Sequence, residues 1–204
     1  HQPYASSASE LVTELLQYIL EPTDLLKIEA EAVLAGIVLD TKNFTMRTGT
    51  RTFEAAAYLR RMGAQTQEVK KLFCDTLESY THKAKLVAAA QVYERCAISV
   101  SDDVPADMMV VVPQAANDLL SISGVDASFV AVDTGNGINV SARSMGDVNV
   151  QVIMEKLGGG GHLTMAGAQL RDASLKETKQ RLMDIIHEYR ENQRAEARGP
   201  KNRA

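Results

Sequence analysis

Several features that would point to a particular class of protein are missing from the sequence. Only two cysteines occur, Cys74 and Cys96, and they form no Cys-x-x-Cys motif. This argues against a zinc knuckle and against a disulfide framework, so a reducing cytoplasm is the expected compartment. The longest apolar runs, Val33–Leu39 and Met108–Val112, are far shorter than the roughly 20 residues that span a bilayer. We therefore expect no contact of this chain with a membrane.

The chain also lacks a starting methionine and an excess of positive charge. It opens on His1-Gln2-Pro3-Tyr4, from which we expect that an upstream part has been removed. Lys and Arg number 22 against 26 Asp and Glu, for a net charge of −4. Tight binding of long nucleic acid needs many cationic contacts, so this balance argues against it and leaves a local basic site open.

What is present is ordinary for a globular protein. The 204 residues, 45% of them hydrophobic and 24% charged, suffice for one large domain or two small ones. The apolar pattern changes near Gln91, from helical spacing to a mixture of strands and helices. We therefore predict an α/β chain that is helical up to a boundary at about 84–90 and mixed after it.

The part before this boundary predicts helices only. A capping box, Ser7-Ala8-Ser9-Glu10, starts the first helix, and Pro22 ends it. The second begins near Asp24 and is apolar on most of its surface over Val33–Val38, which predicts a buried element. Further helices are expected at about 52–62 and 65–90, the latter with a break near Asp75.

The part after the boundary predicts strands as well as helices. Residues 92–100 predict one strand, and 128–132 with 138–143 predict a hairpin around Asp133-Thr134-Gly135-Asn136-Gly137. Helices are expected at about 105–122, 148–157 and from Leu175 to Tyr189. The polar residues from Arg190 to Ala204 are expected to form a solvated, frayed end.

The most informative string is Gly158-Gly159-Gly160-Gly161-His162, which holds four of the chain's 13 glycines. Glycines leave their amide groups bare and adopt conformations that other residues avoid, so such a loop can wrap a phosphate. His162 would add a hydrogen-bond donor or a proton-transfer group at the rim. A flexible linker is the alternative, but the small and apolar residues directly after His162 favour a ligand-binding loop.

A second candidate string, Ser141-Ala142-Arg143-Ser144, closes the predicted hairpin. A guanidinium group matches a phosphate through two parallel hydrogen bonds, so Arg143 with Ser141 and Ser144 is a candidate anion clamp. A strand-end arginine is by itself more often a surface residue. The short sequence distance to the glycine loop favours the functional interpretation.

Asp40 ends the second predicted helix, where its negative charge opposes the helix dipole and needs compensation. A metal ion or a cationic neighbour would supply it, since hard cations favour carboxylate oxygen. Alternatively, Asp40 lies in the cap of the next turn with Thr41 or Asn43. The residues leave both interpretations open, because one carboxylate cannot hold a catalytic metal and no second partner shows metal-ligand spacing.

Together these strings resemble the DHH phosphoesterase family, and most closely the membrane-anchored cyclic-di-AMP phosphodiesterases of Gram-positive bacteria. The resemblance rests on Pro3–Glu10, Gly36–Phe44, Ser141–Ser144 and Gly158–His162, and extends to about Arg190. It implies the helical C-terminal part of a DHH domain over 1–84, a mixed α/β DHH-associated domain that binds substrate over 85–192, and a polar tail over 193–204.

The resemblance also implies a mechanism. The family holds two metal ions, usually manganese, which activate a water for attack on a phosphodiester. Asp40 matches the last metal-ligating aspartate. Ser141, Arg143 and Ser144 match the strand end that anchors the substrate. The loop that grips the substrate is matched by Gly159, Gly160, Gly161 and His162. Cyclic-di-AMP would be opened to the linear dinucleotide.

The sequence departs from the family by lacking its earlier motifs, including the Asp-His-His string and the family's membrane helices. We therefore expect this chain to supply substrate binding within a cytoplasmic part of a membrane-anchored protein, to hold only part of the manganese site, and to have little or no hydrolytic activity alone. The apolar second helix would lack its sheet, so we expect the first eighty or so residues to be loosely ordered or to depend on a neighbouring chain, as in a homodimer.

Two alternatives stay open. One is an enzyme of the same family that trims short oligonucleotides from an end. The other is a non-catalytic module that binds nucleotides or nucleic acid. The acidic net charge leaves short oligonucleotides open as ligands.

Overall fold

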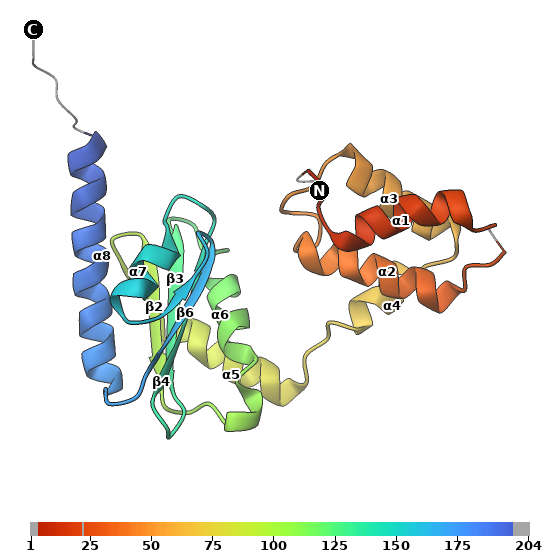
Figure 1. Ribbon diagram of the computed structural model, residues 1–204. Helices are drawn as coiled ribbons and strands as arrows, with labels where there is room; N and C mark the ends of the chain where they lie inside the picture. Colours follow the sequence, from red (N-terminus) through yellow and green to blue (C-terminus); the bar gives the residue numbers. More distant parts are fainter. Residues whose placement is uncertain (1–3, 22, 198–204) are drawn as a thin grey trace, which may run out of the picture. The chain divides into compact units, whose positions relative to one another are not determined.

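The computed structural model describes residues 4–21 and 23–197, which fold into two compact units that divide between Cys74 and Asp75. The first unit contains helices only, and the second contains a six-stranded sheet with helices on both faces (Figure 1). The predicted α/β class is therefore confirmed. Pro22 and the predicted tail from 198 onward lie outside the described residues. Among the described residues, no helix combines the length and the apolar character that crossing a bilayer requires.

The first unit is a cluster of helices around its own apolar core. Its helices are α1 (Ala8–Ile19), α2 (Lys27–Asp40), α3 (Thr50–Arg61) and α4 (Thr66–Lys71). One face of α2 is buried, with Leu34 1% exposed, whereas Leu39 is 63% exposed. The predicted burial of α2 therefore applies to one face, which α1 and α3 cover. Contrary to the expectation of loose order, these residues have a core without the DHH sheet.

Only the serine half of the predicted capping box is formed, and its glutamate links two helices instead. The Ser7 Oγ accepts a hydrogen bond from the Glu10 amide at 3.0 Å, as predicted for the N-cap. The Glu10 carboxylate turns to Ser6, accepting from its amide at 3.3 Å, and to the Thr52 hydroxyl of α3 at 2.6 Å. Glu10 is 1% exposed, so this carboxylate is a buried polar contact between α1 and α3.

We expect Glu10→Gln to destabilise the helical unit in a pH-dependent way. Burial acts to raise the pKa of the Glu10 carboxyl, but hydrogen bonds from Ser6 and Thr52 and the charge of Arg51 outweigh it and hold the pKa below its ordinary value. A carboxyl with a lowered folded-state pKa stabilises the fold above its unfolded-state pKa, and this stabilisation is lost as the pH falls through the folded-state pKa. The substitution should cost about 1–3 kcal/mol at pH 7.

Urea unfolding followed by circular dichroism at pH 7 and at low pH measures this effect. The difference between Glu10→Gln and the unchanged chain should shrink below about pH 4. Glu21→Gln is the matched control, because Glu21 is exposed. An equal loss of stability for Glu10→Gln at both pH values would contradict the assignment.

Helix α5 (Leu77–Ala88) belongs to the second unit, although the sequence places the boundary at about 84–90. The physical reason is the packing of Leu86, which is 1% exposed in a core shared with Val111 of α6 (Val111–Leu119) and Val130 of the sheet. The predicted break near Asp75 separates α4 from α5.

The sheet has the strand order β1-β2-β3-β4-β6-β5, in which β5 is Gly160–Gly161 and β6 is Met165–Leu170. Strands β2 and β3 are parallel, and the other neighbours are antiparallel. The predicted hairpin is present as β3 (Ala127–Asp133) and β4 (Ile138–Ser144). The predicted single strand at 92–100 is wrong. Residues Glu94 and Arg95 form a tight turn with φ values of 47° and 63° that separates β1 (Gln91–Tyr93) from β2 (Cys96–Ser101).

Helices cover the two faces of this sheet unequally. On one face, α7 (Val150–Lys156) and α8 (Leu175–Ala197) pack over a core centred on Phe129, which is 0% exposed. On the other face, α5 and α6 lie on the opposite side in Figure 1 and pack against buried residues of β2 and β3. A short 3₁₀ helix, Ala106–Met108, precedes α6, so the predicted helix at 105–122 is interrupted.

The end of the second unit is more ordered than the sequence predicts. Helix α8 continues through Ala197, and the predicted frayed end is wrong for 190–197. Arg190 is the reason, because its Nη2 pairs with the Asp126 Oδ2 at 2.8 Å and its Nε donates to the Glu94 carbonyl at 3.3 Å.

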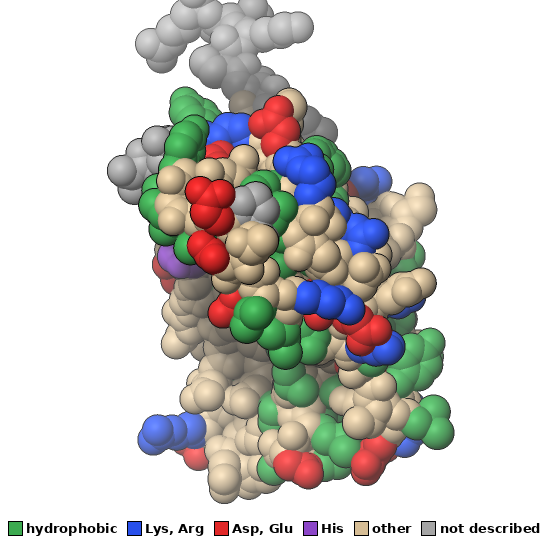
Figure 2. All heavy atoms as spheres, turned by 90° about the vertical axis from the view of Figure 1, so that its right-hand side faces the viewer, with side chains coloured by type: hydrophobic (Ala, Val, Ile, Leu, Met, Phe, Trp, Pro, Cys, Tyr) green, Lys and Arg blue, Asp and Glu red, His purple; other side chains and the backbone are tan. Residues whose placement is uncertain are grey.

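Over the face shown in Figure 2, acidic and basic side chains are interspersed.

Candidate substrate-binding site

The side chains of β4 alternate between the two faces of the sheet. Asn139, Ser141 and Arg143 are partly exposed, and the residues between them are buried toward α7 and α8. On β6 (Met165–Leu170), Gly167 lies opposite Ser141 and faces the same way. Since α6 packs over β2 and β3, the corresponding face of β4 and β6 is left open beside it.

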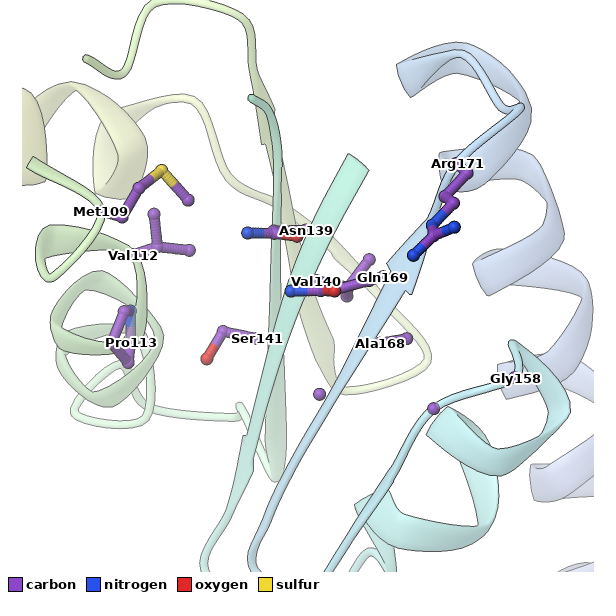
Figure 3. Close-up of a pocket in the computed structure, with 12 residues that line it drawn as sticks. Met109, Val112, Pro113, Asn139, Val140, Ser141, Gly158, Ala168, Gln169 and Arg171 are labelled. Atoms are coloured by element: carbon purple, nitrogen blue, oxygen red, sulfur yellow. The ribbon is translucent and has the colours of Figure 1, made fainter. Parts of the chain in front are cut away.

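A pocket of about 640 Å³ lies on this open face. Met109, just before α6, and Val112 and Pro113, at its start, lie on one side of the pocket, and β4 and β6 lie on the other (Figure 3). A volume of this size is within the range of small-molecule sites. From the sheet side and the glycine loop it is lined by Asn139, Val140, Ser141, Gly158, Gly159, Gly167, Ala168, Gln169 and Arg171.

Ser141 and Gly159 are thus two predicted residues that the structure brings into one pocket. Asn139, Gln169 and Arg171 were missed by the sequence reasoning. The alternation along β4 would have placed Asn139 on the face of Ser141, but the pairing of β4 with β6 leaves no local signal.

Arg143 lies on the same strand face as Ser141, and no carboxylate of the described residues pairs with it. Its Nη1 donates to the Ala142 carbonyl at 2.8 Å, and its buried Nε has no hydrogen-bond partner in this part of the chain. Burial lowers the pKa of the guanidinium. An arginine stays charged in spite of such a shift, so the half-buried guanidinium of Arg143 is a candidate partner for an anion.

Ser144 occupies a different position from the other two members of its string. It is buried on the α7 side of the sheet, and its Oγ accepts hydrogen bonds from the Gly146 amide at 2.9 Å and the Val148 amide at 3.4 Å. These bonds hold the turn that leads into α7. The structure therefore does not bring Ser144 together with Ser141 and Arg143.

Backbone hydrogen bonds hold the glycine loop, and part of it forms a strand. Gly160–Gly161 form β5, which pairs with β6. The amides of Gly158, Gly159 and His162 donate to the carbonyls of Glu155, Met154 and Met165, so they are not free to wrap a phosphate. His162 itself is exposed.

Two of the loop glycines are required by close approach. A Cβ on Gly159 would lie 2.1 Å from the Gly167 carbonyl oxygen, and one on Gly161 would lie 2.4 Å from the Ala166 Cα. Gly160 is different, because no atom of the other described residues, its two chain neighbours aside, lies within 4 Å of its Cβ position. The absence of a side chain at Gly160 therefore has no packing reason, and it leaves open space beside the loop.

Asp40 belongs to the helical unit, where it is the exposed last residue of α2. The three residues from Lys42 to Phe44 have φ values of 46°, 58° and 62°. Thr41 holds this strained turn, since its Oγ1 donates to the Ile37 carbonyl at 2.7 Å and accepts from the Phe44 amide at 3.0 Å. The cap of the turn is therefore supplied by Thr41.

The described residues do not make a manganese site by themselves. Over residues 4–21 and 23–197, no group of three or more His, Cys, Asp or Glu side chains could hold a metal ion. Asp40 offers one exposed carboxylate of the type that hard cations prefer.

Comparison with known families decides what the second unit is. Residues 95–192 match the DHHA1 domain family. They form a DHHA1 domain. The resemblance of this part to a DHH-associated domain is therefore confirmed. Within the DHHA1 domain, the open face of β4 and β6 and the glycine loop all lie inside the matched residues.

Similar proteins extend the likeness to most of the chain. It is 53% identical over 190 residues to the cyclic-di-AMP phosphodiesterase GdpP of Geobacillus thermodenitrificans, which covers 92% of this chain and 29% of that protein. It is 29% identical over 196 residues to the bifunctional oligoribonuclease and PAP phosphatase NrnA of Thermus thermophilus, covering 91% of this chain and 58% of that protein. The predicted likeness to cyclic-di-AMP phosphodiesterases is confirmed, and the chain spans under a third of the length of that relative.

A solved structure shares the fold. The crystal structure of an exopolyphosphatase-related protein from Bacteroides fragilis matches 95% of this chain and 59% of its own chain, with a TM-score of 0.82 and 20% identity.

Proposed function

We propose that this chain is the substrate-binding part of a manganese-dependent phosphodiesterase that hydrolyses cyclic-di-AMP to the linear dinucleotide. The observation that carries the proposal is Arg143, a half-buried guanidinium whose Nε has no hydrogen-bond partner among the described residues. Arg143 does not line the pocket itself, but it lies on the same strand face as Ser141, which does. A buried cation without a counter-charge is costly to the fold, so a phosphate is the natural partner.

The identity of the substrate class draws support from two features. The chain is 53% identical to a protein named cyclic-di-AMP phosphodiesterase. The open face also carries few cations, Arg143 on β4 and Arg171 after β6, which suits a short ligand with one or two phosphates better than a long polyanion.

A short-oligonucleotide exonuclease is the second candidate, and the likeness to NrnA favours it. Both candidates require an anionic dinucleotide-sized ligand on the open face. They differ in which of the two ligands binds more tightly.

The proposed metal site is one that this chain shares with metal ligands from outside its 204 residues. When bound, such ions activate water and stabilise the charge of the reacting phosphate. From this chain Asp40 is the candidate ligand. We expect the 204 residues alone to bind substrate with little or no hydrolysis.

Calorimetric titration of the 204-residue chain with cyclic-di-AMP tests the proposal, together with a hydrolysis assay in the presence of Mn²⁺. Binding without turnover is expected. Absence of binding would contradict the proposed function, and turnover well above background would contradict the division of roles. Tighter binding of a short single-stranded RNA than of cyclic-di-AMP would favour the second candidate.

We expect Gly160→Ala to weaken cyclic-di-AMP binding about tenfold without changing stability by more than about 0.5 kcal/mol. The added methyl group enters open space, so only a ligand on the loop would meet it. Gly159→Ala should instead lower the free energy of unfolding by about 1–3 kcal/mol, because its Cβ clashes with the Gly167 carbonyl. Thermal unfolding and titration of both variants separate the two effects. Unchanged binding by Gly160→Ala would place the ligand away from the loop.

A further inference from the structure

The open face of β4 and β6 carries two primary amides in a directly opposed pair. Asn139 on β4 is the cross-strand partner of Gln169 on β6, two residues along the strand from the pair of Ser141 with Gly167. Directly opposite residues in antiparallel strands have Cβ atoms about 4.5–5.5 Å apart, so the two amides are close enough to act on one group. Both line the pocket, and Figure 3 shows them extending toward the side where Met109 and Val112 lie.

These two side-chain amides do not stabilise the described fold through hydrogen bonds. Neither the Asn139 nor the Gln169 side chain makes a hydrogen bond to another described residue. Gln169 is exposed and Asn139 is half-buried, so structural stability does not require an amide at either position. Each amide therefore offers its NH2 group as donor and its carbonyl oxygen as acceptor to a ligand in the pocket.

The donor and acceptor pattern of an amide fits one purine better than the other. Adenine presents its N6 amino donor beside the N7 acceptor, and a single Asn or Gln side chain satisfies both at once. Guanine presents two acceptors, O6 and N7, at the same edge, and this pattern is met by two donors, as in arginine. The facing wall of Met109, Val112 and Pro113 is apolar, so it can cover the flat face of a base.

We propose that Asn139 and Gln169 form a subsite that reads the adenine edge of the bound dinucleotide, while Met109 and Pro113 cover the face of the base. The inference rests on the proposed function and deepens it, because it assigns the choice of base to residues other than those that bind phosphate. Arg143 holds the phosphate on the same strand face, and the amide pair selects the base farther along it.

Titration of the 204-residue chain with cyclic-di-AMP and with cyclic-di-GMP tests the subsite. The unchanged chain should bind cyclic-di-AMP at least about tenfold more tightly. Gln169→Leu removes the hydrogen-bonding groups at similar length, and it should weaken cyclic-di-AMP binding about tenfold with less than about a twofold effect on cyclic-di-GMP. Gln169→Arg should improve cyclic-di-GMP binding. Gln180→Leu, an exposed glutamine of α8, is the matched control and should change neither affinity.

The outcomes separate the subsite from the proposed function. Equal weakening of both ligands by Gln169→Leu, no change in either, or no preference in the unchanged chain would overturn the adenine subsite, while cyclic-di-AMP binding that depends on Arg143 would remain. If the unchanged chain binds neither cyclic dinucleotide, the proposed function fails and the subsite fails with it. Thermal unfolding of Gln169→Leu should match that of the unchanged chain, since the residue is exposed.

Discussion

Replacement of Arg143 by alanine is expected to weaken the binding of cyclic-di-AMP about 100-fold. A guanidinium contacts a phosphate through two charge-assisted hydrogen bonds, each contributing about 1.5–3 kcal/mol, and a loss of about 2.7 kcal/mol is 100-fold in affinity. Isothermal titration of the 204-residue chain measures the change.

The same substitution should leave the fold at least as stable as before. The Arg143 Nε is buried without a partner among the described residues, and the guanidinium donates to the carbonyl of its chain neighbour Ala142, so alanine removes a desolvated group at the loss of one local hydrogen bond. A loss of binding with an unchanged or raised melting temperature is the pattern expected of a residue kept for ligand binding.

Two further variants complete the test of Arg143. Arg143→Lys keeps the charge and loses the planar fork, so its affinity should lie between those of arginine and alanine. Arg181→Ala removes an exposed arginine of α8 and should change nothing. Unaltered binding by Arg143→Ala would show that the phosphate lies elsewhere.

Phe129→Ala is expected to lower the free energy of unfolding of the DHHA1 domain by about 3–5 kcal/mol. Phe129 is fully buried at the centre of β3, in the core that α7 and α8 cover. The helical unit has a separate core around Leu34 and Leu59, so its stability should stay the same. Hydrogen exchange with mass spectrometry reads both units in one experiment.

In that experiment, amides of β3 and β4 should exchange faster in the variant, and amides of α2 should not. Val152→Ala is the control, because Val152 on α7 is 40% exposed and loses less burial. Faster exchange of α2 in Phe129→Ala would mean that the two units unfold together.

The accuracy of the sequence predictions follows from how local each signal is. The hairpin of β3 and β4 was predicted because its turn contains Gly135 and Gly137, which both adopt positive φ. The turn between β1 and β2 was missed because Glu94 and Arg95 take up positive φ without any glycine, and the partner of Arg95, Asp126, is distant in the sequence. Arg190 was assigned to a frayed end for the same reason, since its partner is also Asp126.

The candidate site shows the same division. Ser141 and Arg143 were correctly placed at the end of a hairpin strand, and alternation alone separates Ser144 from them. Asn139 and Gln169 could not be paired from the sequence, because their proximity depends on the register of two strands about thirty residues apart. Neither residue type is unusual by itself at a strand position.

The loop glycines have a consequence for how such motifs are interpreted across genomes. Gly159 and Gly161 are glycine because a side chain at either position would collide with the backbone of β6. A search for the glycine string would therefore collect domains that share this strand packing, whatever molecule each of them binds. Differences in ligand between such domains should instead be sought at positions such as Gln169, where no backbone contact excludes a side chain.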